Sequence, residues 1–215
     1  ERMLARNKLN SKLAEIVYSY NWNYTDPMGI EPQLLGHNLE FWLPNTPNFT
    51  EHPEWFNTDE NGTPVPVSAQ TQINFFSAEA ADAVAENMIR FAETYGKDTI
   101  GIGINDNRNF RQNGLEKQPF TTEEGVTVEP ADPAYLSTVY YTFLNRVARQ
   151  VRAALPDVKI MTFAYFFTET PPKISDLEDN IVIVLAPITG DDREPINTEK
   201  ENPNNACHEN LLAWC

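Results

Sequence analysis

The sequence predicts an α/β domain built on a parallel sheet, and three continuous apolar runs carry this prediction. The runs are TIGIGIN (99–105), KIMTFAYFF (159–167) and NIVIVLAPI (180–188). Runs of this kind are typical of strands that are buried on both faces and alternate with helices. Such a sheet closes into a (β/α)8, TIM-type barrel or stays open as a doubly wound sheet. No glycine-rich phosphate fingerprint follows any of the three strands, which weakens the option of a nucleotide-binding sheet.

Two long amphipathic helices are expected beside these strands. The first covers 78–95, because Ser77 is a good N-cap, apolar residues recur at helical spacing and Gly96 ends the pattern. The second covers 133–155, where apolar residues also gather on one face. A final helix is expected at 205–214. It would hold Cys207 and Cys215 about 12 Å apart, at about 1.5 Å per residue, which is too far for a disulfide.

The remaining segments are less regular. The expected elements are the end of a helix at 2–10, a strand at 36–44, short helices at 47–56, a tight turn at Asn61-Gly62, a strand at 72–76 and a functional loop at 107–132. This gives five or six strands, whereas a complete barrel has eight. We therefore expect one barrel-like domain over residues 1–215, incomplete in this fragment and truncated at both ends.

The composition excludes some classes of partner. The chain has 215 residues with 41% hydrophobic residues, which is enough to bury a core. Its net charge of −15 would repel a phosphate backbone, so nucleic acid is not an expected partner. No apolar run approaches the roughly 20 residues needed to cross a bilayer, so membrane insertion is not expected either.

The residue that follows the first predicted strand is the strongest candidate for function. Asp106 stands where both parallel architectures meet their ligands, at the carboxyl end of a strand. It either faces a site or caps a turn through its own backbone, as Asp and Asn often do. Asn105 and Asn107 beside it are weaker candidates for ligand contact. Tyr165, near the end of 159–167, can donate a hydrogen bond to a sugar or a carboxylate, although aromatic strand residues are usually core.

His37 and Trp42 are further candidates for substrate binding. If 36–44 is a loop after an earlier strand, His37 faces the site. If a strand begins at 36, His37 lies at the amino end of that strand, away from the site. Trp42 can stack on a sugar ring or pack in the core. The three histidines have no paired spacing, and we expect neither a metal nor another cofactor.

Carboxylates also follow the later strands, at Glu169, Asp191 and Asp192. Cleavage of a glycosidic bond requires two carboxyl groups, one to protonate the leaving oxygen and one to attack or to activate water. In a chain this acidic, loop carboxylates are mostly solvated surface, so both interpretations stay open.

Several motifs, in their order along the chain, resemble a bacterial family, the domain of unknown function numbered 4838. They include HPEWF (52–56), QINFFS (72–77), INDN (104–107), AYFFTETPPK (164–173), NIVIVLAPI (180–188) and the C-terminal Cys207-x-x-Asn210 with Trp214. The resemblance covers nearly the whole chain. Many members carry cysteines just after the Asn-Asp and Pro-Ile positions, but this chain has none there, so a cysteine-based metal or redox role is not implied.

Members of that family resemble (β/α)8 glycoside hydrolases of the α-glucuronidase and hexosaminidase groups. The resemblance implies that Asp106 ends the fourth barrel strand, where those enzymes hold a general acid. It also implies a secreted, periplasmic or cell-surface location and flanking domains in a longer chain. These expectations are transferred from the glycoside hydrolases by analogy at the level of the fold.

Three functions follow from these expectations. The favoured one is a glycoside hydrolase that acts on a polysaccharide or glycan, with Asp106 as proton donor. The alternative is a non-catalytic glycan-binding domain on the same scaffold. The third is a structural module whose acidic face docks against neighbouring domains.

Overall fold

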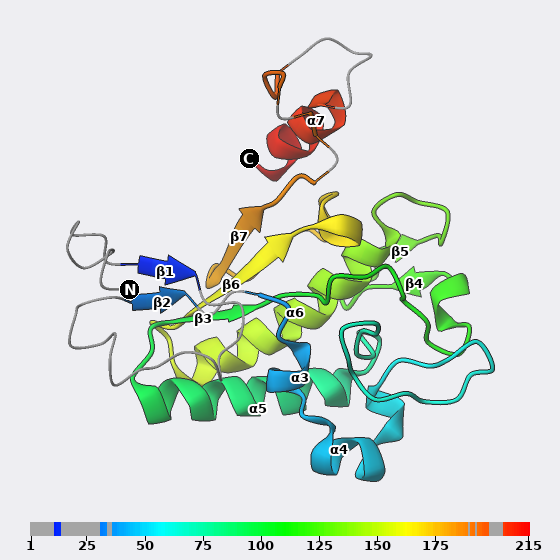
Figure 1. Ribbon diagram of the computed structural model, residues 1–215, viewed down its shortest axis with the longest axis vertical. Coiled ribbons are helices and arrows are strands. Elements are labelled where there is room, and N and C mark those ends of the chain that lie inside the picture. Colours follow the sequence, from blue (N-terminus) through cyan, green and yellow to red (C-terminus); the bar gives the residue numbers. More distant parts are fainter. Residues whose placement is uncertain (1–10, 14–30, 34–35, 189, 192, 198–203) are drawn as a thin grey trace.

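The centre of the computed structural model is a three-stranded parallel sheet with the strand order β3-β6-β7 (Figure 1). The structure describes residues 11–13, 31–33, 36–188, 190–191, 193–197 and 204–215. The strands are β3 (Thr99–Ile102), β6 (Lys159–Ala164) and β7 (Ile181–Leu185). A second parallel pair, β1 (Ser11–Leu13) with β2 (Glu31–Gln33), lies beside β3. The predicted α/β class with a parallel sheet is confirmed, and within the described ranges no closed barrel is formed.

Two long helices, α5 (Ala78–Tyr95) and α6 (Tyr135–Ala154), pack against each other alongside the sheet (Figure 1). α5 begins and ends as predicted, because the Ser77 side chain accepts a hydrogen bond from the Ala80 N–H and Gly96 adopts a left-handed conformation. Arg146 of α6 forms a bidentate pair with Asp82 of α5, at 2.7 and 2.9 Å. This pair fixes the register of the two helices.

The two faces of β6 are covered to different extents. Ile160, Thr162 and Ala164 are completely buried, and the Thr162 hydroxyl lies 2.7 Å from the Tyr140 hydroxyl of α6. Met161 and Phe163, which alternate with them, are only half-buried. Side chains in a strand alternate between faces, so the next residue in extended conformation, Tyr165, continues the half-buried face. This alternation brings Tyr165 to the open side of the strand end.

The segments before α5 differ from the prediction. The expected strand at 36–44 is wrong, because Leu39–Trp42 form a helix, α3. Its buried residues Leu39, Trp42 and Leu43 have the spacing of a helix and not the alternation of a strand. The expected strand at 72–76 is also wrong: Ile73 makes only an isolated bridge to Phe56. The Asn74 side chain accepts a bond from the Phe76 N–H and so starts a turn.

Other expected elements are present, some with shorter bounds. The short helices are α4 (Asn45–Glu51) and a 3-10 turn, η3 (Pro53–Trp55). The segment 107–132 contains a 3-10 turn, η4 (Leu115–Lys117), and a hairpin of β4 (Phe120–Thr121) with β5 (Thr127–Val128). β6 ends at Ala164, before a 3-10 turn, η5 (Phe166–Thr168). The expected helix end at 2–10 lies outside the described residues.

The C-terminal helix, α7 (Asn204–Trp214), lies at the carboxyl end of β7 in Figure 1. The Trp214 ring packs 5.2 Å from the Tyr141 ring of α6. Its cysteines are free, with Cys207 buried and Cys215 exposed, as the helix predicted. No described helix is long and apolar enough to cross a membrane.

Candidate active site

Asp106 lies at the corner of a tight turn just after β3. The Asn107 N–H donates to the Asn105 carbonyl at 2.7 Å, which closes a three-residue turn around Asp106. The Asp106 side chain is exposed at this corner. The turn therefore presents a carboxylate to solvent at the carboxyl edge of the sheet.

The two asparagines that flank Asp106 hold this turn in place. The Asn105 amide donates to the carbonyls of Ser68 and Thr71, both at 2.8 Å, and Asn105 is only 4% exposed. The Asn107 amide donates to the Ala69 carbonyl at 3.0 Å. Both amides therefore support the turn that carries Asp106, and their contact with a ligand stays a prediction.

A buried glutamine completes the support of the turn. The Gln72 amide donates to the Asn105 carbonyl at 2.9 Å and to the Asn107 side-chain oxygen at 3.1 Å. Its oxygen accepts from the Asn105 N–H at 2.9 Å, and the side chain is completely buried. This role was not predicted, because Gln72 was expected in a strand. The polar residues clustered at 68–72 were the available signal.

Tyr165 connects β6 to Asp106. The Tyr165 hydroxyl donates to Asp106 Oδ1 at 2.7 Å. Burial and the neighbouring Asp106 carboxylate raise the pKa of Tyr165 to about 12, so its hydroxyl stays protonated and able to donate at ordinary pH. Two adjacent parallel strands thus contribute one group each to a hydrogen-bonded pair.

His37 reaches the same place from the loop before α3. Its Nδ1 lies 2.7 Å from the Ile104 carbonyl, and its ring centroid lies 5.9 Å from that of Tyr165. Because a carbonyl only accepts, Nδ1 carries the proton, and Nε2 of the neutral ring is left as an acceptor. The side chain is exposed. The structure therefore brings His37, Tyr165 and Asp106 together.

The loop that carries His37 is attached to the edge of β3. The Asn38 amide donates to the Gly101 carbonyl at 2.9 Å, and Asn38 Oδ1 accepts from the Gly103 N–H at 3.0 Å. A Cβ at Gly103 would collide with the Gly36 carbonyl, so this position requires glycine. Gly103 therefore makes room for a neighbouring backbone.

Trp42 lies in the core and not at the site. It is 1% exposed, and its indole N–H donates to the Gly101 carbonyl at 2.8 Å. Its ring packs edge-on against Phe41 and Phe91. A sugar cannot stack on a ring that is covered in this way, so the core alternative describes Trp42 in this structure.

Arg108 and Phe166, which were not predicted as site residues, lie next to Tyr165 and Asp106. The Arg108 guanidinium lies 5.1 Å from the centroid of Phe166, whose ring is 4.2 Å from the Tyr165 ring. Phe166 has a positive φ of 51°, which is uncommon for a bulky residue. This arrangement places a cation and an aromatic surface beside the carboxylate.

The other expected carboxylates lie elsewhere. Asp191 forms an ion pair with Arg193 at 2.7 Å, and Asp192 is outside the described residues. Glu169 is 7% exposed under α7: its Oε1 accepts from the Asn210 amide at 3.2 Å, and its carbonyl accepts from the Trp214 indole at 2.8 Å. Burial raises the pKa of the Glu169 carboxyl.

We expect Glu169→Gln to stabilise the docking of α7 at neutral pH. A raised pKa in the folded state means that the stabilising contribution of Glu169 is complete below its unfolded pKa and is lost as pH rises through the folded value. Glutamine keeps the acceptor for Asn210 without a buried charge. The melting temperature at pH 7 should rise by about 2–4 °C, equivalent to about 1 kcal/mol for a chain of this size, and should not change at pH 4. An equal change at both pH values would contradict this interpretation.

Among the described residues, no group of three or more His, Cys, Asp or Glu side chains is placed to hold a metal ion. The candidate site is therefore a carboxylate–tyrosine–histidine group at the carboxyl edge of a parallel sheet, on an α/β fold.

This chain belongs to the DUF4838 family, a domain of unknown function, whose model matches residues 5–215.

Comparison with other known proteins adds little. No curated protein matches the chain. A solved structure, that of a GH36 α-galactosidase variant from Geobacillus stearothermophilus in complex with 1-deoxygalactonojirimycin, is similar at 10% identity with a TM-score of 0.39. The match covers 88% of this chain and 31% of the α-galactosidase chain, so this chain spans about a third of that protein.

Proposed function

We propose that this chain is the site-bearing part of a carbohydrate-active, (β/α)8-type domain, and that it takes part in glycoside hydrolysis with Asp106 as a catalytic carboxylate. The observation that carries the proposal is the 2.7 Å hydrogen bond from Tyr165 to Asp106, at the carboxyl ends of two adjacent parallel strands. Ligands of parallel α/β domains bind at this edge.

The hydrogen bond from Tyr165 bears on the role of Asp106. Because Asp106 Oδ1 accepts from the Tyr165 hydroxyl, the proposal gives Asp106 the role of the carboxylate that attacks, activates water or stabilises a positively charged transition state. The proton donor would then be another group. Glu169 has the raised pKa that this role requires, but α7 covers it.

The surrounding groups match the chemistry of a sugar. Sugar hydroxyls both donate and accept, and the site offers Asp106 and His37 Nε2 as acceptors and Arg108 as a donor. Phe166 adds an aromatic ring at the same place. By family resemblance, we further propose a secreted, periplasmic or cell-surface protein in which flanking domains accompany this chain.

A non-catalytic glycan-binding domain is the second candidate. The specific observation that favours it is the burial of Glu169, because the carboxyl that follows the strand next to Asp106 is then held away from solvent. Binding would keep Asp106, Tyr165 and His37 as hydrogen-bonding groups and would need no second carboxyl.

The two candidates are separated by assaying the complete protein on plant, algal and host polysaccharides for release of reducing ends and, in parallel, for binding. Release of reducing ends supports the hydrolase. Binding without release supports the second candidate. If neither occurs with any polysaccharide, the carbohydrate proposal is wrong and the structural module is favoured.

A further inference from the structure

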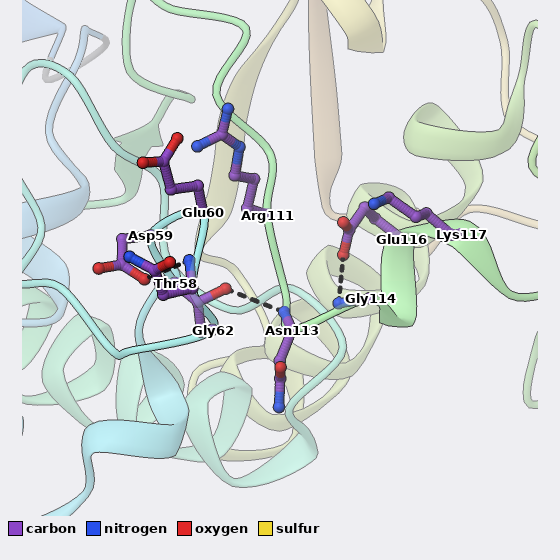
Figure 2. A pocket seen from close by; sticks show the side chains of 10 residues that line it. Thr58, Asp59, Glu60, Gly62, Arg111, Asn113, Gly114, Glu116 and Lys117 are labelled. Carbon is purple, nitrogen blue, oxygen red and sulfur yellow. Dashed lines mark hydrogen bonds between the residues drawn. The ribbon is translucent and has the colours of Figure 1, made fainter.

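We propose that a second pocket, between the turn at 58–62 and the loop at 111–117, binds a neutral sugar unit of the same glycan that reaches Asp106. This inference rests on the proposed function. The pocket has a volume of about 540 Å³ and is lined by Thr58, Asp59, Glu60, Asn61, Gly62, Arg111, Asn113, Gly114, Glu116 and Lys117 (Figure 2). Asp106 is not among these residues, so the pocket is a separate site.

The walls of the pocket are joined by buried polar side chains. Gln112 donates to Asn57 Oδ1 at 2.6 Å, and both side chains are at most 3% exposed. The Thr58 N–H donates to the Arg111 carbonyl at 3.0 Å, and the Thr58 hydroxyl accepts from the Asn113 N–H at 2.9 Å. A pocket held in this way is formed before its ligand arrives, which lowers the entropic cost of binding.

Two of the three carboxylates in the pocket serve its own turns. Asp59 Oδ1 accepts from the N–H groups of Asn61 and Thr63, at 2.8 and 2.9 Å. Glu116 Oε2 accepts from the N–H groups of Gln112 and Gly114, at 2.9 and 3.1 Å. These bonds fix the carboxylates in place and keep both loops tightly turned.

The other three charged side chains are available to a ligand. Within the part of the chain that the structure describes, the charged ends of Glu60, Arg111 and Lys117 make no hydrogen bond or ion pair. Figure 2 shows Glu60 and Arg111 extending toward the same side of the pocket, away from the Asn113 side chain. In a chain of net charge −15, cations left without a partner at a preformed pocket are a feature that structural pairing does not explain.

The charges in the pocket select a neutral ligand. Three carboxylates (Asp59, Glu60, Glu116) and two cations (Arg111, Lys117) line it, so its formal charge is −1. This charge and that of the whole chain disfavour an anionic sugar. A hydroxyl group can donate to Glu60 and accept from Arg111, whereas a carboxylate can only accept. Vicinal hydroxyls of a neutral sugar satisfy both kinds of group.

The pocket lies within reach of the candidate active site. Arg111 follows Asp106 by five residues on the same loop, so their Cα atoms are at most about 18 Å apart. A short oligosaccharide can therefore contact both, and the pocket would add affinity without contacting the reacting bond.

The test is isothermal titration calorimetry of the complete protein with neutral hexasaccharides of glucose, mannose, galactose and xylose, and with hexagalacturonate. We expect Arg111→Ala to weaken binding of the neutral ligand about tenfold, equal to about 1.4 kcal/mol. Glu60→Gln should also weaken binding of the neutral ligand. Arg90→Ala is the matched control, because Arg90 is an exposed arginine on α5 that lines a different groove. Binding should also be nearly unchanged between about 50 and about 300 mM NaCl, because the ligand carries no charge.

Several outcomes would overturn the inference. If Arg111→Ala and Glu60→Gln bind the neutral ligand as tightly as the unmodified protein, the pocket is not a subsite. If hexagalacturonate is the ligand that Arg111→Ala loses, the pocket is an anion site instead. If Asp106→Asn loses binding while Arg111→Ala and Glu60→Gln keep it, the pocket proposal is wrong but the proposed function stands. If the unmodified protein binds none of the hexasaccharides, the proposed function is contradicted as well. Unchanged melting of Arg111→Ala is expected because the guanidinium makes no hydrogen bond or ion pair with the described residues, and it confirms that the variant is folded.

Discussion

Replacing Trp42 by alanine is expected to lower the free energy of unfolding by about 3–5 kcal/mol. The indole is 1% exposed and packs against Phe41 and Phe91, with ring centroids 4.7 and 5.4 Å away. The Gly101 carbonyl that it binds also accepts from Asn38, so the truncation leaves no unpaired carbonyl. The loss is therefore one of packing, and it leaves a cavity under α3. Urea unfolding should give a lower midpoint with an unchanged slope.

Trp55→Ala is the matched control for this variant. Trp55 is half-buried and stacks on the His52 ring at 3.9 Å, so its truncation should cost clearly less than that of Trp42. If Trp42→Ala kept its urea midpoint but lost glycan binding, Trp42 would be a ligand residue and its burial in the core would not describe the functional state.

The parts of the fold that the sequence predicted correctly are those in which one local rule acts alone. α5 begins at a serine cap and ends at Gly96, and its apolar residues form a single face. The predictions of strands at 36–44 and 72–76 were wrong because side-chain hydrogen bonds compete there with strand formation. The Asn38 side chain accepts a hydrogen bond from the Gly103 N–H, just after β3. The Asn74 side chain accepts one from the Phe76 N–H, two residues further along the chain. The Asn38 contact joins residues 65 positions apart, and one sequence does not reveal which amide meets which edge. The Asn74 contact is local, but it competes with a strand pattern that reads equally well.

The candidate site was predictable in position but not in the division of roles. The rule that ligands meet strand ends selected Asp106 and Tyr165, and the structure joins them by a hydrogen bond. The same rule could not separate Asp106 from Asn105 and Asn107. At this turn Asp106 is the exposed corner residue, whereas the amides of Asn105 and Asn107 donate to the backbone of residues 68–71. Gln72 was missed because its role depends on contacts across 33 residues of sequence.

Replacing Asp106 by asparagine is expected to reduce kcat/KM for glycan hydrolysis by about 10²–10⁴-fold, the range that a positioned acid or base contributes. Stability should change little, since the side chain is exposed and accepts one described hydrogen bond. Asp157→Asn is the matched control, because Asp157 is an exposed aspartate just before β6, at the other end of the sheet, and its substitution should leave turnover unchanged. A large fall in melting temperature with Asp106→Asn, or undiminished turnover, would contradict a catalytic role.

Tyr165→Phe separates support of the carboxylate from the chemistry itself. Phenylalanine preserves the ring contacts with His37 and Phe166 but removes the donor 2.7 Å from Asp106, so we expect kcat/KM to fall about tenfold, equal to about 1.4 kcal/mol. Because the pKa of Tyr165 is raised to about 12, the hydroxyl holds its proton throughout the working range, and no basic limb below about pH 10 should come from this residue. A loss of activity as large as that expected for Asp106→Asn would show instead that the tyrosine hydroxyl itself contacts the reacting sugar.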